Sequence, residues 1–474
     1  MDKPTIPTFA VLGHPNEGKS SVVSTLTEDD SVRISPIPGE TTVCRHYPVT
    51  IDGREILRFV DTPGFQQPRK TLEWLAAFQG PPADMAAAFI AAHKDNPDFS
   101  HETELFSPLA KGAGIVFVVD GSRPLRRVDI MEMDILRLTG LPRMAVINTK
   151  EHHRAEFLDD WKHEARKHFN TVRLFDAHRA TCAERIDLLE GLKHIDPEWQ
   201  PMLQEVIAAF KNDWQGRIDH AVTVILDLLA GAALHVISDT CGDESQAPQI
   251  RTKLEARYRA DIQKMEKAAL QAIRKLFKHN LFDVELPPHS IVNEDLFSKK
   301  AWHVLGLDQW QLAAAGAAAG GILGANIDLA LAGHSLGAFT AIGGLLGGGS
   351  AIFGARRAFN ARIKGLPLGR LKVEVGPVKT DQMLFILLDR ALIYFSHVSN
   401  WAHSRREPPL QAPAPAGRQG ITSQWEAPKR KDFGRFFAAA RKNDWAALAA
   451  LKPVVAGILG RTLQDMSERK APVE

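Results

Sequence analysis

The segment Gly13-His-Pro-Asn-Glu-Gly18-Lys19-Ser20 constrains this chain most, because it matches the GxxxxGK[ST] pattern of a phosphate-binding loop. An apolar run, Thr8–Leu12, precedes it and predicts a strand, while Ser21–Leu26 begins a predicted helix. Glycines let backbone N–H groups turn toward phosphate oxygens, and the helix N-terminus adds positive potential. We expect Lys19 to reach the β- and γ-phosphates and Ser20 to offer its hydroxyl to Mg²⁺. An incidental glycine-rich turn is the alternative, and the flanking strand and helix argue against it.

Residues 1–198 show the alternation of strands and helices that is typical of an α/β domain. Asp52-Gly53, between two apolar runs, is a strong signal for a two-residue hairpin. The candidate strands are Thr8–Leu12, Val43–Ile51, Glu55–Asp61, Gly114–Asp120, Arg143–Asn148 and Thr171–Phe175. One antiparallel hairpin followed by parallel strands predicts a mixed, mostly parallel sheet with helices on both faces.

A second motif, Asp61-Thr-Pro-Gly64, ends the third candidate strand. An acidic residue at this point can hold Mg²⁺ through water, and the N–H of Gly64 would lie close to a γ-phosphate. DxxG alone is a weak pattern. Its place one hairpin after the phosphate loop makes it a specific one, so we predict that both motifs serve one nucleotide site.

The order of Gly13–Ser20, Pro38-Gly-Glu-Thr41 and Asp61–Gly64 resembles the TrmE–Era–Der class of GTPases. The resemblance covers residues 8–180 and implies a Ras-like P-loop G domain that binds GTP and GDP and hydrolyses GTP with Mg²⁺. It also implies that Thr41 is the switch I threonine that contacts Mg²⁺. Thr42 is the near alternative, and either residue could instead be an ordinary surface hydroxyl of the switch loop.

The resemblance assigns roles to individual residues of this sequence. It implies nucleotide contacts for Gly13, Asn16, Glu17, Gly18, Lys19, Ser20, Ser21, Asp61, Gly64, Asn148, Glu151 and Ala177. It implies Mg²⁺ contacts for Ser20, Thr41 and Asp61. It implies a part in hydrolysis for Lys19, Asn16 and Thr41.

The base-reading motif departs from that class. The family has Asn-Lys-x-Asp after the fifth strand, where this chain has Asn148-Thr-Lys-Glu151. Glu151 replaces the Asp that pairs two guanine N–H groups, and Thr149 replaces the Lys whose stem packs on the base. A carboxylate can still accept those bonds, and Ala177 would offer its N–H to the base carbonyl. We therefore expect guanine to be preferred, with reduced selectivity.

The residue that follows Asp61–Gly64 bears on hydrolysis. Many GTPases place a Gln there to orient the attacking water, but Phe65 cannot do so, and the two Gln residues after it are out of register. The class often has a hydrophobic residue here and recruits a potassium ion through an Asn of the P-loop, which Asn16 matches. Stabilising the loop turn is the alternative role of Asn16. Arg45 and Arg69 are candidate internal arginine fingers or ordinary surface charges.

Beyond residue 198 the pattern becomes helical, and the chain resembles a sparsely characterised bacterial family that joins an Era-like G domain to a helical region of unknown function. We predict a helical domain over 199–406, a Pro-rich linker over 407–428 and a helical segment over 429–474. A helical insertion at about 66–111 is a candidate switch or lid. The predicted C-terminal elements are helices at Pro201–Ser238, Arg251–His279, Thr380–Arg405 and Lys431–Leu463, and a strand at Arg370–Val375.

A Gly/Ala-rich tract over 311–354 has small residues at four-residue spacing, which lets helices approach closely, as in membrane helix pairs. We predict a close-packed helical hairpin, either buried against the protein's own helices or associated with the inner membrane. Within the tract, Gly333-His-Ser335-Leu-Gly337 matches the GxSxG nucleophile elbow of lipases. The α/β sheet that an elbow requires is missing there, so we do not expect Ser335 to be a nucleophile.

Charge and cysteine content limit the partners and the compartment. A net charge of +2 gives no broad basic field, and we find no motif for reading DNA. Three widely separated cysteines favour a reducing cytoplasm over a disulfide framework. Two functions remain open: a GTPase switch whose helices contact a protein, RNA or membrane effector, and a membrane-associated mechanochemical NTPase with relaxed base specificity. The oligomeric state is not predicted.

Overall fold

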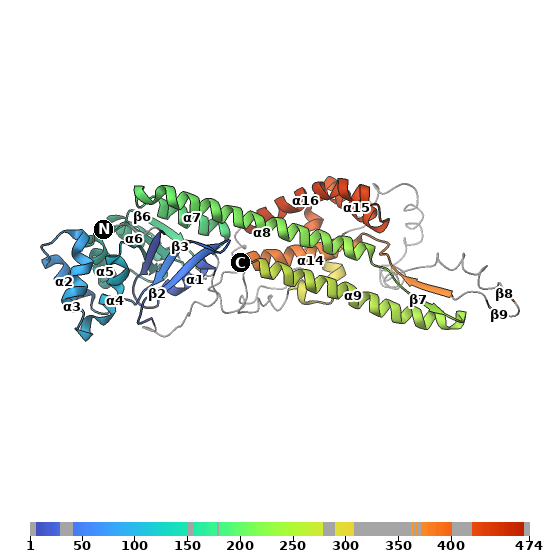
Figure 1. Cartoon of the computed structure of the whole chain (residues 1–474), viewed down its shortest axis with the longest axis horizontal. Coiled ribbons are helices and arrows are strands. Elements are labelled where there is room, and N and C mark those ends of the chain that lie inside the picture. The colour runs from blue at the N-terminus through green and yellow to red at the C-terminus, as the bar shows by residue number, and fades with distance from the viewer. Residues whose placement is uncertain are drawn as a thin grey trace.

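The structure is a computed structural model of the 474-residue chain (Figure 1). A domain built on one sheet and a bundle of long helices lie end to end along the longest axis of the molecule. The residues that the structure describes are 6–28, 41–149, 155–177, 180–277, 290–307, 362–363, 366–367, 371–400 and 420–468.

Six strands form the sheet of the N-terminal domain, in the order β2-β3-β1-β4-β5-β6. Strand β2 runs antiparallel to β3, and every other neighbouring pair runs parallel. The strands are β1 Thr8–Leu12, β2 Arg45–Ile51, β3 Arg54–Asp61, β4 Gly114–Asp120, β5 Arg143–Asn148 and β6 Thr171–Phe175. This topology confirms the predicted Ras-like fold and its mixed, mostly parallel sheet.

Local sequence explains how the strands are set. Asp52 and Gly53 have φ angles of 53° and 75°, the left-handed pair that a tight two-residue hairpin requires. All residues of β4 are buried, as its apolar sequence predicts for a central strand. Because parallel strands end at the same edge of a sheet, Asp61 of β3 and Asn148 of β5 come to the edge that also carries the loop after β1.

Helices cover both faces of this sheet (Figure 1). One face packs against α1, α7 and the first turns of α8, and the other packs against α2 to α6. The bounds are α1 Lys19–Thr27, α2 Pro68–Ala77, α3 Met85–His93, α4 Ser100–Ala110, α5 Arg127–Leu138, α6 Leu158–His168 and α7 Cys182–Lys193.

The predicted insertion consists of α2, α3 and α4, held together by aromatic side chains. Trp74 of α2 meets Phe89 of α3 edge-on, with ring centroids 5.2 Å apart. Phe89 lies 4.8 Å from Phe106 of α4 by the same measure. Phe65, directly after the DxxG motif, belongs to the same buried cluster. The insertion therefore shares a core with the loop that leaves β3.

The C-terminal half is a helical bundle with a core of its own. Helix α8 is 35 residues long and joins the two halves, since Leu203 and Ile207 lie in the core of the N-terminal domain while Ile218 and Ile225 lie in the core of the bundle. The described helices are α8 Gln200–Leu234, α9 Ala247–Leu276, α10 Lys299–Leu305, α14 Gln382–Ser399, α15 Ala427–Arg441 and α16 Trp445–Glu468.

Helix α14 lies at the centre of the bundle and is buried along most of its length. It carries two adjacent charged residues in this apolar setting. Asp389 accepts hydrogen bonds from the N–H and the hydroxyl of Thr422, at 2.8 and 2.9 Å. Arg390 pairs with Glu266 of α9 and donates to the carbonyl of Glu294 at 2.8 Å. The two side chains thus fix the segments around Glu294 and Thr422 against the bundle.

A two-stranded sheet in the bundle was not predicted in full. Strand β10, Leu371–Val375, is close to the predicted strand, and it pairs antiparallel with β7, Ile237–Cys241. The predicted helix Pro201–Ser238 runs into β7, but α8 ends at Leu234. Nothing local in the sequence marks β7, because its partner lies about 130 residues further on and pairing across the chain creates it. Two further short strands, β8 Arg362–Ile363 and β9 Leu366–Pro367, pair with each other.

Two predictions near the C-terminus differ from the structure. The single helix predicted over Lys431–Leu463 is two helices, because the chain turns at Asn443, which has a φ of 54°, and Asp444 then accepts a hydrogen bond from the N–H of Ala447 at 3.0 Å. The predicted linker over 407–428 is described from residue 420 onward, and there it is folded: Thr422 is fully buried against α14.

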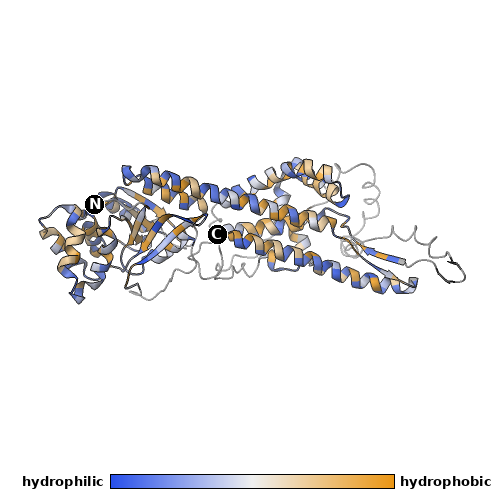
Figure 2. Ribbon diagram, in the orientation of Figure 1, coloured by the Kyte–Doolittle hydropathy of each residue, from blue (hydrophilic) through white to orange (hydrophobic). Residues whose placement is uncertain are grey.

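Hydropathy is distributed as expected for packed elements, with apolar residues on the inner faces of the long helices (Figure 2). Among the described helices, α16 is long and apolar enough to cross a membrane by length and composition, and 28% of its most apolar window is buried. The predicted hairpin over 311–354 and the elbow-like motif at Ser335 lie outside the described residues.

Candidate nucleotide site

The phosphate loop turns between β1 and α1 with a backbone that requires glycine. Gly13 has a φ of 141°, and a Cβ there would lie 2.2 Å from the carbonyl oxygen of Val118. At Gly18, with a φ of 91°, a Cβ would lie 2.3 Å from the side-chain nitrogen of Asn148. Asn16 is exposed and also left-handed, with a φ of 67°, a conformation that Asn tolerates better than most residues. The loop is therefore seated directly on the ends of β4 and β5.

Lys19 lies in the loop as a phosphate-binding lysine should. It is buried, and its ammonium donates to the carbonyl oxygens of Gly13 and His14 at 3.1 and 3.0 Å. Burial lowers the pKa of Lys19, while Asp61 and Glu132 act in the opposite direction. A buried ammonium held against the loop is placed to pair with phosphate oxygens that enter the loop.

The residues predicted for Mg²⁺ converge on one carboxylate. Ser20 donates to Asp61 Oδ2 at 2.8 Å, and the side chain of Thr41 also hydrogen-bonds to Asp61. Asp61 is 2% exposed, and its Oδ1 has no hydrogen-bond partner among the described residues. Burial raises the pKa of Asp61, whereas Lys19 and these hydroxyls lower it. One carboxylate and two hydroxyls beside a phosphate site are the hard oxygen donors that suit Mg²⁺.

The base side of the site is organised around Asn148, which is fully buried. Its side-chain nitrogen donates to the carbonyl of Glu17 at 3.3 Å, and its oxygen accepts from the N–H of Ala177 at 3.2 Å. Thr25 of α1 donates to the carbonyl of Ala177 at 2.7 Å. The loops after β5 and β6 are thereby tied to the phosphate loop. Glu151 lies outside the described residues, so its contact with a base stays a prediction.

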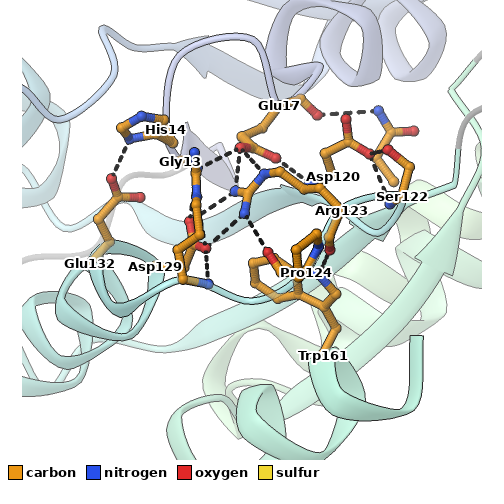
Figure 3. Close-up of polar contacts among 12 residues, drawn as sticks. Gly13, His14, Glu17, Asp120, Ser122, Arg123, Pro124, Asp129, Glu132 and Trp161 are labelled. Carbon is orange, nitrogen blue, oxygen red and sulfur yellow. Dashed lines mark hydrogen bonds and ion pairs between the residues drawn. The ribbon is translucent and has the colours of Figure 1, made fainter. Parts of the chain in front are cut away.

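Glu17 has a structural role that sequence reasoning missed. Its carboxylate accepts from the N–H of Asp120 at the end of β4 and pairs with the guanidinium of Arg123 (Figure 3). Arg123 in turn binds Asp129 of α5 at 2.7 Å, and its guanidinium lies 5.1 Å from the ring centroid of Trp161. The Glu17 side chain is 4% exposed and points into the protein, so only its backbone could contact phosphate.

A second contact joins the loop to α5. His14 Nδ1 lies 2.9 Å from Glu132 Oε1, and Glu132 is fully buried (Figure 3). Burial raises the pKa of Glu132, and the neighbouring His14 acts in the opposite direction. Spacing in the sequence gives no signal for this pair, since 118 residues separate its members.

The segment after DxxG packs closely on the phosphate loop. A Cβ on Gly64 would lie 2.6 Å from the Cδ of Pro15, so the backbone there approaches the loop directly. Phe65 is apolar and only 1% exposed, so its side chain cannot orient a water molecule at the phosphate. Of the two candidate arginine fingers, Arg69 is 83% exposed and pairs with Glu73, and Arg45 is exposed at the start of β2.

The structure therefore brings most of the predicted residues to one place. Those within or beside the loop are Gly13, Asn16, Glu17, Gly18, Lys19, Ser20 and Ser21, and those facing it are Thr41, Asp61, Gly64, Asn148 and Ala177. Within the described ranges no group of three or more His, Cys, Asp or Glu side chains suggests another metal centre.

Two family models match successive parts of the chain. A model described as "50S ribosome-binding GTPase" matches residues 8–149. A model described as "Domain of unknown function (DUF3482)" matches residues 162–453, more than half of the chain. The chain belongs to the DUF3482 family. Within this DUF3482 protein, the matched domain of unknown function begins inside α6 of the G domain and extends through most of the bundle.

The relatives of the N-terminal domain are GTPases. GTPase Der of Paraburkholderia phymatum is 30% identical over 146 residues, which are 31% of this chain and 27% of that protein. GTPase Der of Agathobacter rectalis is 36% identical over 72 residues, or 15% of this chain and 16% of that protein. The DUF3482 protein thus matches less than a third of the length of these relatives.

Solved structures give a weaker similarity. A crystal structure of Era in complex with MgGDPNP and nucleotides 1506–1542 of 16S ribosomal RNA is 15% identical, with a TM-score of 0.30, over 58% of this chain and 91% of that chain. The motif geometry, the family model and the Der relatives together confirm the N-terminal half as an Era-like P-loop GTPase domain.

Proposed function

We propose that this protein is a Mg²⁺-dependent GTPase switch whose helical half is the effector region. The observation that carries the proposal is the convergence of Ser20 and Thr41 on Asp61, next to the buried Lys19. Thr41 is the last residue of the Pro38-Gly-Glu-Thr41 segment, which lies between α1 and β2 in the sequence, and Asp61 begins the Asp61–Gly64 motif. A γ-phosphate would therefore contact two segments that can change position when it is lost.

The chemistry asked of these residues is positioning and charge neutralisation. Backbone N–H groups of the loop and the N-terminus of α1 would hold the phosphates, with Lys19 as the side-chain cation. Ser20 and Thr41 would hold Mg²⁺, and Asp61 would support it, most simply through water. Bound Mg²⁺ would neutralise charge on the β- and γ-phosphate oxygens. Gly64 would place its N–H at the γ-phosphate and thereby distinguish GTP from GDP.

We also propose that potassium stimulates hydrolysis. Phe65 is buried and cannot position water, so another source of transition-state stabilisation is needed. Asn16 stands at the exposed, left-handed position of the loop, where its side chain could bind a monovalent cation beside the phosphates. Rates measured in KCl and NaCl at equal ionic strength test this, and Asn16→Ala should abolish any difference. Equal rates in both salts would refute it.

The central experiment measures binding of fluorescent GDP and hydrolysis of GTP by the full chain. Lys19→Ala should weaken binding at least tenfold, and chelation of Mg²⁺ should stop hydrolysis until Mg²⁺ is restored. Lys162→Ala, which removes a lysine paired with Asp159 on the surface of α6, is the matched control and should change neither. ADP should bind more weakly than GDP, by a smaller margin than in a GTPase with a complete base-reading motif. Unchanged binding in Lys19→Ala would overturn the assignment of the phosphate site.

A second candidate is contact with a membrane through α16. Its most apolar window has a mean hydropathy of 1.4, and Trp445 and Val454 are 68% and 45% exposed. Such a contact would favour a membrane-associated, mechanochemical role, with the protein otherwise in the cytoplasm. Flotation with anionic vesicles tests it: the double variant Trp445→Ser, Val454→Ser should lose binding, while Leu174→Ser, which changes an exposed leucine on β6, should not. Failure of the wild type to float would exclude this role.

A further inference from the structure

Glu102 of the insertion makes an unusual contact with the segment that follows DxxG. Its side chain is fully buried. Its Oε1 accepts hydrogen bonds from the backbone N–H of Gln66 at 2.7 Å and of Gln67 at 2.6 Å. Its Oε2 has no hydrogen-bond partner within the described part of the chain. A single carboxylate oxygen therefore anchors two consecutive backbone groups.

Burying a carboxylate is costly unless hydrogen bonds or charges compensate for the water it loses. Here the compensation comes from N–H groups at the start of α2, where the helix dipole also favours a negative charge. Pro68, the first residue of α2, has no N–H, so Gln66 and Gln67 supply the donors just before it. An apolar side chain at residue 102 could pack in the same place, but it could not fix these two N–H groups.

The anchored segment is the one that must be positioned for hydrolysis. Gly64 is held against Pro15 of the phosphate loop by close backbone packing, and Phe65 is held by burial in the core of the insertion. Glu102 fixes the two residues that come next. The loop from Gly64 to the start of α2 is thus constrained at each residue before it becomes helical.

The same helix also holds the segment after switch I. Glu104, two residues further along α4, accepts a hydrogen bond from the N–H of Cys44 at 2.8 Å. The thiol of Cys44 donates to the carbonyl of Glu104 at 3.2 Å. Cys44 lies three residues after Thr41, which hydrogen-bonds to Asp61. Helix α4 therefore contacts both segments that face the γ-phosphate.

We propose that Glu102 is a positioning residue for GTP hydrolysis, through which the insertion holds the Gly64–Gln67 segment in the arrangement that the reaction requires. The inference rests on the proposed GTPase function and adds a specific task for the insertion. Gln66 and Gln67 contribute their backbone rather than their side chains. The benefit is preorganisation, because a segment that is already held near its reactive position loses less conformational entropy when the transition state forms.

The test compares Glu102→Ala with Glu102→Gln in the full chain, by single-turnover GTP hydrolysis and by the Kd of fluorescent GDP. Glu102→Ala removes the acceptor, and we expect the hydrolysis rate to fall by about 10- to 100-fold. The Kd for GDP should change less than about threefold, because the diphosphate is held by the loop and not by the segment after DxxG. Glu102→Gln keeps one acceptor oxygen and should recover most of the rate.

Glu73→Ala is the matched control, because Glu73 lies on α2 of the same insertion, is 64% exposed and pairs only locally with Arg69. It should hydrolyse GTP as the wild type does. A wild-type rate in Glu102→Ala, or a rate higher than wild type, would overturn the inference while leaving the GTPase assignment intact. A wild-type protein that binds no nucleotide would instead overturn the proposed function. Equal loss of GDP binding and hydrolysis in Glu102→Ala would show a structural role only and would also refute positioning.

Discussion

Replacing Glu28 by Gln should loosen the junction between the G domain and the helical bundle. Glu28 follows α1, and its carboxylate pairs with Arg185 of α7 at 2.5 Å and Arg217 of α8 at 2.6 Å. The side chains of Glu28, Arg185 and Arg217 are 6%, 9% and 8% exposed, so solvent and salt screen the charges little. Trp214 lies beside both guanidinium groups, 5.5 and 5.8 Å from its ring centroid.

The expected loss follows from this burial. Removing one partner of a buried ion pair typically costs about 3–5 kcal/mol, because the remaining charge is left in a poorly solvated place. Arg217 keeps a second partner, Asp213, at 2.5 Å, so only Arg185 loses most of its compensation. We therefore expect about 3 kcal/mol, the lower end of that range. The more exposed ion pair of Arg58 and Glu55 should contribute less than about 1 kcal/mol to the free energy of unfolding.

Urea unfolding followed by circular dichroism and by tryptophan fluorescence measures this difference. Both signals are needed, because two halves with separate cores need not unfold in one step. Glu55→Gln is the control. Comparing Glu28→Gln and Arg217→Met, each alone, with the double variant gives the coupling energy between the two side chains. If Glu28→Gln costs no more than Glu55→Gln, the cluster is not a structural junction and the reasoning from burial is wrong.

Three other changes should have measurable effects. Gly13→Ala would place a Cβ 2.2 Å from the carbonyl oxygen of Val118 at a φ of 141°, so we expect at least about 2 kcal/mol of lost stability and no GDP binding, measured by urea unfolding and fluorescence. Burial raises the pKa of Asp389 from its usual 3.8 to about 7. The folded state therefore keeps a proton that the unfolded chain releases, so the free energy of unfolding should fall as pH rises from 3.8 to about 7. Asp389→Asn should make the free energy of unfolding less dependent on pH, which urea unfolding midpoints measured at pH 5 and pH 8 would show. Arg123→Met leaves the buried Glu17 with only the more distant guanidinium of Arg126, at 3.5 Å, so we expect a cost of about 3 kcal/mol, the lower end of the range for a broken buried pair, with weaker GDP binding as the second measurement; a loss under about 1 kcal/mol would contradict the buried network.

The nucleotide site could be predicted because its residues are set by short-range geometry. A loop that must turn at Gly13 and Gly18 to expose backbone N–H groups leaves a pattern of fixed spacing in the sequence. Asp61 could be placed because it ends a strand next to β1, and parallel strands meet at one edge. Asn148 was located by the family resemblance, which places an Asn after the fifth strand, whereas the order of the strands within the sheet was not predicted.

What could not be predicted depends on contacts between distant parts of the chain. The side chain of Glu17 pairs with Arg123, which is 106 residues away in the sequence. Glu102 of α4 accepts a hydrogen bond from the backbone N–H of Gln66, which precedes α2. Neither contact leaves a recognisable pattern in the sequence, because a single Glu or Arg in a sequence looks the same whether it is buried or on the surface. The strand β7 was missed for the same reason, because only its partner β10 makes that stretch extended.

Helix α8 gives the molecule a mechanical property. At 1.5 Å per residue, its 35 residues make a rod about 52 Å long that starts in one core and continues through the other without an intervening hinge. A rotation of about 5° at the G-domain end would displace the far end by about 4–5 Å, by simple geometry from that length. A small rotation of the N-terminal domain together with the start of α8 would therefore produce a much larger displacement at the tip of the bundle beside β7 and β10.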